Sequence, residues 1–152
     1  MAKYATGTTV SAEKSKVEIE QTLNRYGATR FMSGYDGNKA IIVFEAHNRQ
    51  VKFELILPAV SQFSGSRRGR GSRSSPQVKH DAEVRRLWRA LALAIKAKLE
   101  VVASGIATFE SEFLANIVLP SGKTMGEWSE VALEQVYSGQ PLPPLLGSGE
   151  PK

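Results

Sequence analysis

Two different periods of hydrophobic and polar residues run through the first 57 residues, and each predicts a different kind of element. Near the N-terminus the hydrophobic positions mostly suit one face of a helix over residues 12–26. Ser11 or Thr8 can serve as its N-cap, and Gly27 stands just past its end. The hydrophobic positions are Val17, Ile19, Leu23 and Tyr26. We therefore expect an amphipathic helix at the start of the chain.

A pattern typical of β-strands replaces the helical period in the next three segments. Residues 29–35 are rich in aromatic and β-compatible residues, and residues 39–46 and 50–57 are the clearest strands. In the last segment hydrophobic residues alternate with Lys52 and Glu54, which indicates a sheet with one buried face. Because short turn-like links separate the three segments, we expect an antiparallel meander.

A second and much longer helical pattern covers residues 76–103. It follows Ser75 and Pro76, and serine as N-cap with proline at the first helical position is a sound helix start. Its hydrophobic residues recur at steps of three and four: Val84, Leu87, Trp88, Leu91, Ile95, Leu99 and Val102. Two shorter helices are predicted at residues 108–114 and 124–137.

The order of these elements predicts an α+β fold. It would consist of an N-terminal helix, a three-stranded antiparallel meander, a long amphipathic helix over the sheet and two shorter C-terminal helices. A chain of 152 residues, 41% of them hydrophobic, has the size of one domain with a real core. We expect this domain to span residues 1–140, with a flexible basic loop at 61–75 and a proline- and glycine-rich tail at 141–152.

The composition excludes several kinds of chemistry. The chain has no cysteine, which rules out disulfides, thiolate zinc sites and thiol nucleophiles. No apolar run approaches the length of a membrane span or of a signal-peptide core, so we expect a soluble, cytoplasmic protein. His80, Asp81 and Glu83 lack the second histidine or the glycine-anchored loop of a metal site, and the usual hydrolase and P-loop spacings are absent. We expect no enzymatic activity, no metal and no cofactor.

Positive charge is concentrated in the middle of the chain, which carries +5 overall. Residues 67–99 contain 10 basic and 2 acidic residues, a net charge of +8, whereas residues 100–152 contain 2 basic and 7 acidic residues, a net charge of −5. This asymmetry favours a polyanionic partner, with nucleic acid first. The alternative is a solvated surface whose oppositely charged parts attract each other, within one chain or between the subunits of a homo-oligomer.

The candidate nucleic-acid-binding residues form two neighbouring groups. Four lie in a glycine- and serine-rich loop that can follow a phosphate backbone without a fixed shape: Arg67, Arg68, Arg70 and Arg73. Five lie on or beside the polar face of the long helix: Lys79, Arg85, Arg86, Arg89 and Lys96. Phosphate contacts of this kind give affinity with little sequence readout. The alternatives are a flexible, solubilising linker and an ordinary solvated helix face.

Three aromatic residues are candidates for base stacking, because proteins that bind single strands stack bases on exposed rings. They are Phe63, Phe31 and Tyr35, and only Phe63 lies near the basic loop in the sequence. Packing in the core or at its rim is the alternative for all three. The hydrophobic faces of the predicted elements contain Phe44, Phe53 and Trp88, which we expect in the core.

Two stretches have an unusual order of residues: MAKYATGTTVSAEKSKVEIEQTLNRYGATRFM and WRALALAIKAKLEVVASGIATFESEFLANIVLPSGKTMGEW. Together they resemble a widespread family of short proteins from tailed-phage genomes. The resemblance extends from Met1 to about Leu146 and leaves the basic loop as the variable part. It implies a phage or prophage origin, a place in the bacterial host cell, and a gene setting often close to DNA replication and recombination genes. It carries over no functional residue.

The charge pattern and this resemblance together predict a non-enzymatic, nucleic-acid-binding accessory protein in DNA replication or recombination. It would contact mainly backbone phosphate. DNA is expected rather than RNA, and the implied gene setting somewhat favours single-stranded DNA. The alternative is a non-catalytic protein-interaction module, such as an inhibitor of a host enzyme or defence system. The small size and the acidic C-terminal helix favour this second hypothesis.

Overall fold

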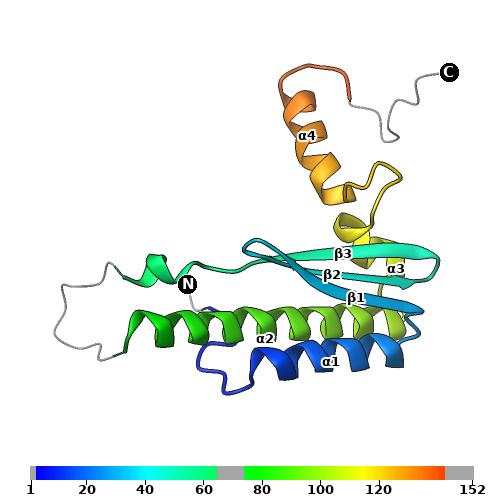
Figure 1. Ribbon diagram of the computed structural model, residues 1–152. Coiled ribbons are helices and arrows are strands. Elements are labelled where there is room, and N and C mark those ends of the chain that lie inside the picture. The colour runs from blue at the N-terminus through cyan, green and yellow to red at the C-terminus, as the bar shows by residue number, and fades with distance from the viewer. Residues whose placement is uncertain (1–2, 65–73, 143–152) are drawn as a thin grey trace.

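A computed structural model describes residues 3–64 and 74–142 of the chain. The elements in chain order are α1 (Ala12–Arg25), β1 (Arg30–Asp36), β2 (Lys39–Ala46), β3 (Arg49–Ile56), the 3₁₀ helix η1 (Val60–Phe63), α2 (Pro76–Ala103), α3 (Phe109–Phe113), the 3₁₀ helix η2 (Leu114–Asn116) and α4 (Met125–Tyr137). Figure 1 shows α1 and α2 side by side along one face of the sheet, with α4 standing away from both. The predicted α+β architecture is confirmed.

Helix α1 begins where the sequence predicts. The Ser11 hydroxyl accepts a hydrogen bond from the backbone N–H of Lys14 at 3.2 Å, which satisfies one of the free donors of the first turn. The buried face is formed by Ala12, Ser15, Ile19, Thr22 and Leu23. Val17, which we expected on this face, is 51% exposed. The expectation was wrong because two small polar residues, Ser15 and Thr22, complete the buried stripe in its place.

The sheet has the strand order β1-β2-β3, and both neighbouring pairs are antiparallel. Two-residue turns join the strands. Gly37 has a φ of 58° in the first turn, and His47 and Asn48 have φ values of 51° and 57° in the second. Such left-handed positions match the twist of a tight hairpin. The His47 ring stacks on Phe109 at 4.6 Å between ring centroids, which helps to hold a conformation that is uncommon outside glycine.

The core lies between one face of the sheet and helices α1, α2 and α3. Phe44 of β2 stands opposite Phe31 of β1 and Val51 of β3, so all three strands contribute to the same face. The Phe113 ring contacts the Phe44 ring edge-on, at 5.9 Å between centroids. The most deeply buried large side chains are Trp88, Phe44, Phe113, Ile19, Leu23, Ile42, Ile95 and Val51. This places Phe44 and Trp88 in the core, as predicted.

Helix α4 starts close to the body of the protein and then leaves it. Thr124 and Glu127 form a reciprocal capping box at its N-terminus. A Cβ atom on Gly126 would lie 2.8 Å from the carbonyl oxygen of Ala115, so only glycine lets the first turn of α4 come this close to η2. Beyond this contact Leu133 and Val136 are exposed, and Figure 1 shows the helix projecting from the sheet.

Candidate nucleic-acid interface

The N-terminal half of α2 extends past the hydrophobic core. The first buried residue of the helix is Trp88, so the twelve residues 76–87 contain none. Figure 1 shows this half of the helix continuing beyond the end of the sheet, beside η1 and the N-terminal segment. The Ser75 hydroxyl accepts the N–H of Val78 at 3.3 Å, and Pro76 occupies the first turn, which together start the helix without help from the core.

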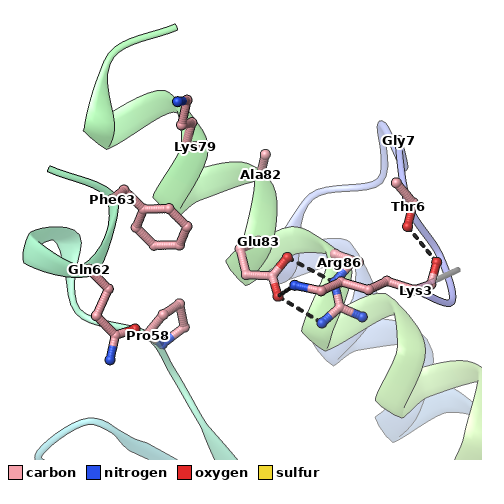
Figure 2. Close-up of a pocket in the computed structure, with 10 residues that line it drawn as sticks. All are labelled: Lys3, Thr6, Gly7, Pro58, Gln62, Phe63, Lys79, Ala82, Glu83 and Arg86. Atoms are coloured by element: carbon pink, nitrogen blue, oxygen red, sulfur yellow. Dashed lines mark hydrogen bonds and ion pairs between the residues drawn. The ribbon is translucent and has the colours of Figure 1, made fainter. Parts of the chain in front are cut away.

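A cleft of about 520 Å³ opens between this half of α2, η1 and the N-terminal segment. Three cationic side chains line it: Lys3 from the N-terminal segment, and Lys79 and Arg86 from α2. Figure 2 shows Phe63 and Pro58 on the side opposite Glu83 and Arg86. With three cations and one carboxylate, the lining has a formal net charge of 3 − 1 = +2. The cleft therefore combines positive charge with an aromatic and apolar wall.

Glu83 organises the charged side of the cleft. Its carboxylate accepts hydrogen bonds from Arg86 Nε at 2.9 Å and Nη2 at 2.8 Å, and it forms an ion pair with Lys3 Nζ at 3.4 Å. The hydrogen bonds from Arg86 hold the pKa of Glu83 below its usual value, and the same contact raises the pKa of Arg86. Arg86 Nη1 also donates to the carbonyl oxygen of Tyr4 at 3.2 Å, so this guanidinium ties the N-terminal segment to α2.

Three of the predicted helix cations have no direct polar partner among the described residues, although, besides the contact with His80, the charge of Arg85 helps to lower the pKa of the Asp81 carboxyl. Within the part of the chain that the structure describes, no side-chain hydrogen bond or ion pair engages Lys79, Arg85 or Lys96. Lys79 lines the cleft, and Arg85 lies on the adjoining surface with Thr8 and Thr9. Lys96 is seventeen positions after Lys79, about 25 Å along the helix, and does not belong to the cleft.

Arg89 has a different environment from its neighbours. Its guanidinium pairs with Glu18 of α1, and only 22% of its side chain is exposed. The predicted strip of Arg85, Arg89 and Lys96 along one open helix face is therefore interrupted at Arg89, because α1 packs against that side of α2. An ion pair of this kind helps to join two helices and leaves little charge available to a ligand.

Of the three aromatic candidates for base stacking, one lies at the cleft and two lie elsewhere. Phe63 is half-buried at the cleft, and its ring meets His80 edge-on, with 6.2 Å between ring centroids. Phe31 is half-buried and packs against the core from β1. Tyr35 is 61% exposed, and its hydroxyl accepts a hydrogen bond from Lys16 Nζ, which also lies 4.7 Å from the centre of the Trp88 ring. Only Phe63 is placed beside cationic residues of the cleft.

The predicted loop arginines, Arg67, Arg68, Arg70 and Arg73, lie outside the described residues, as does the tail from residue 143. The described chain stops one residue after Phe63 and resumes at Ser74. Residues 61–63 of the predicted loop belong to η1. Lys3 is the cationic cleft residue that sequence reasoning missed, since no spacing or motif connects residue 3 with residues 79–86.

His80 contacts its neighbour in the sequence, Asp81. Its Nδ1 lies 3.0 Å from Asp81 Oδ1, and this contact lowers the pKa of the Asp81 carboxyl. In residues 3–64 and 74–142, no three histidine or acidic side chains gather where they could hold a metal ion. The same residues form no helix that is both long and apolar enough to cross a membrane.

Comparisons with known proteins add no relative. No protein-family model matches the chain, and no curated protein and no solved structure is significantly similar to it. A function can therefore be inferred only from the charges and geometry of the cleft and from the sequence.

Proposed function

We propose that this protein binds nucleic acid without catalysis, through the cleft between α2, η1 and the N-terminal segment. The observation that carries the proposal is the convergence of Lys3, Lys79 and Arg86 on a lining of net charge +2. Arg85, which forms no ion pair within the described residues, adjoins it. In the sequence, the four loop arginines lie between Phe63 and Lys79, two residues that line this same cleft.

Lys79 and Arg85 are the side chains best suited to phosphate, because neither has an ion pair with a described residue that binding would have to break. Arg86 is held by Glu83 and the Tyr4 carbonyl, so it positions the N-terminal segment rather than offering a free guanidinium. Contacts with phosphate release counterions, so affinity falls steeply with salt and varies little with sequence. Phe63 provides one half-buried ring at the site for a base to stack on.

The resemblance to short phage proteins supports DNA as the polyanion and an accessory role in replication or recombination. Single-stranded DNA fits the proposal better than duplex, because an unpaired base can reach the Phe63 ring.

Fluorescence anisotropy with labelled single-stranded DNA, duplex DNA and RNA at two salt concentrations tests this proposal. The double substitution Lys79→Ser and Arg85→Ser should weaken binding to every sequence and flatten the salt dependence. A second variant changes the four loop arginines to serine and should act in the same direction. No binding at low salt would end the proposal.

The matched control removes the same two charges elsewhere. Arg25, at the end of α1, and Lys123, in the turn before α4, are both exposed and lie outside the cleft. The double substitution Arg25→Ser and Lys123→Ser should leave binding nearly unchanged. An equal loss of affinity in the control would mean that net charge alone attracts nucleic acid and that the cleft has no part in binding.

A second candidate function, a protein-interaction module, is favoured by α4. Leu133, Val136 and Tyr137 share one face of this helix and are exposed, and the helix contains Glu127, Glu130 and Glu134 with no basic residue. Recovery of one stoichiometric protein from nuclease-treated host lysate would support this role if the variant Leu133→Ser with Val136→Ser loses it. Val17→Ser with Leu114→Ser is the matched control, because it replaces an equally exposed valine and leucine elsewhere.

A further inference from the structure

The two edge strands of the sheet, β1 and β3, differ in whether another segment covers their outer side. The C-terminal segment covers the outer edge of β3: the N–H of Val118 donates to the carbonyl oxygen of Gln50 at 2.8 Å, and Asn116 Nδ2 donates to that of Lys52 at 3.1 Å. Along the outer edge of β1, no segment of residues 3–64 and 74–142 pairs with the strand. The sheet therefore ends in one protected edge and one open edge.

Strand β1 also has few of the features that usually protect an open edge, since its only charged residues, Arg30 and Asp36, lie at its two ends. Six of its seven residues are exposed, with Met32 at 64% and Tyr35 at 61%. The strand contains no proline and no lysine, and its pairing with β2 runs from Arg30 to Asp36 in one unbroken register without a bulge. An open edge of this length with no interruption is a template for pairing with another strand.

The hairpin turn determines which backbone groups of β1 are free. The turn at Gly37 and Asn38 has two residues, so Asp36 and Lys39 close it as a hydrogen-bonded pair. Because the direction of backbone groups alternates along a strand, every second residue back from Asp36 faces β2. The N–H and C=O groups of the intervening residues, Phe31, Ser33 and Tyr35, are then directed outward, away from the sheet.

The sequence of β1 is complementary to itself when it is read antiparallel about Ser33. In that register Arg30 of one chain lies opposite Asp36 of a second copy, and Asp36 lies opposite the Arg30 of that copy. Phe31 then lies opposite Tyr35, and Met32 opposite the small Gly34. Opposite charges and aromatic pairs facing each other across strands are the pairings that stabilise a sheet. The outward-facing residues 31, 33 and 35 also meet one another in this register, as antiparallel hydrogen bonding requires.

We propose that two copies of this chain associate through the open edge of β1, antiparallel about a two-fold axis at Ser33. The result is a dimer with a continuous six-stranded sheet. The contact is isologous, so it closes on itself and leaves neither copy with an open β1 edge. This inference rests on the sheet alone and does not depend on nucleic-acid binding.

Sedimentation velocity of nuclease-treated protein over a range of concentrations tests the dimer. The wild-type protein should sediment as a particle with twice the chain mass of 16.6 kDa. Arg30→Asp places Asp opposite Asp in both pairs, and Asp36→Arg places Arg opposite Arg, so each variant alone should lose the dimer. A wild-type chain that stays monomeric at every concentration overturns the proposal.

An equimolar mixture of the two variants provides the decisive control. In a mixed dimer one chain carries an acidic residue at both positions 30 and 36, and the other carries a basic residue at both. Each of the two cross-strand pairs then joins opposite charges, so both become attractive again. Only the register about Ser33 predicts that two monomeric variants form a one-to-one heterodimer when they are mixed. A mixture that remains monomeric contradicts this register. Formation of the heterodimer also shows that both variants are folded.

A single cysteine tests the position of the axis. The chain has no cysteine of its own, and hydrogen-bonded residues opposite each other are about 5.5 Å apart between Cα atoms, within disulfide range. Ser33→Cys should therefore form a disulfide-linked dimer under mild oxidation, whereas the exposed control Ser138→Cys should stay mostly monomeric. Equal cross-linking of the two variants would contradict the proposed axis. So would the capture of another protein's strand at β1 in place of a second copy.

Discussion

The two halves of helix α2 have the same backbone conformation but different surroundings. Residues 88–103 contain all four buried residues of the helix, which pack against the sheet and α1, whereas residues 76–87 contain none. The N-terminal half is instead held by η1, by the partly buried Val84 and by polar contacts of the N-terminal segment, namely Lys3 with Glu83 and Arg86 with the Tyr4 carbonyl. One helix therefore anchors the fold with one half and presents the cationic cleft with the other.

This difference means that stability and binding should respond to different substitutions. Removing a buried side chain from the C-terminal half leaves a cavity in the core. Changing a side chain of the N-terminal half alters the charge and shape of the cleft, while most of the buried surface stays intact. Three predictions test the separation, from the largest expected effect to the smallest.

The largest effect is expected for a β-branched residue in the anchored half. Ile95 is 0% exposed, and Ile95→Ala should lower the free energy of unfolding by about 2–5 kcal/mol, because the cavity can close only in part. Val78, on the same helix, is 54% exposed, and Val78→Ala should change the free energy of unfolding by no more than about 0.5 kcal/mol. Urea unfolding measures both. Similar losses in the two variants would mean that the halves are equally part of the core.

An intermediate and local effect is expected at the start of the helix. Ser75→Ala removes the hydroxyl that accepts the Val78 N–H, a loss of about 1 kcal/mol for the first turn. Because no buried residue lies in the first three turns, the cost should appear as faster hydrogen exchange in this half, with little change in global unfolding. If the global free energy of unfolding falls by the full amount instead, the projecting half folds together with the core.

The smallest effect concerns pH and Glu83. Because the pKa of Glu83 is lowered in the folded state, mainly by Arg86, its carboxylate stabilises the fold at pH values above its unfolded pKa, about 4.3. This contribution is lost as the pH falls through the folded pKa. Glu83→Gln should therefore be less stable than the wild-type chain at pH 7, and the gap should close in acid. A gap that does not narrow as the pH falls from 7 into the acid range would assign the effect to packing rather than to charge.

Much of the fold follows from local patterns that can be read along the sequence. Ser11, Ser75, Thr108 and Thr124 act as N-caps because a hydroxyl needs to reach only two or three residues ahead. The failure at Val17 has an equally physical cause. Whether a helix buries a valine or a serine depends on where its partner helix lies, and Ser15 is buried because α1 packs closely against the core there.

The candidate site was only partly accessible to the same reasoning. The sequence located the positive charge, including Lys79, Arg85 and Arg86. It gave no means of telling which cations are available to bind phosphate. Arg89 is paired with Glu18 from another helix, and Lys3 reaches the cleft from a position eighty residues away from Glu83. Contacts between residues so distant in sequence have no local signal, so their pairing could not be predicted.

The sequence by itself determined the kinds of elements, their caps and turns, and the concentration of charge, because these depend on neighbours a few residues apart. Only the tertiary structure decided which cations meet in a cleft and which are paired between helices. It also decided that the edge of β3 is covered while no described segment pairs with that of β1, because the segment that covers β3 comes from more than sixty residues further along the chain. The self-complementary order of β1 was present in the sequence throughout, but it became meaningful only once that strand was seen at an open edge.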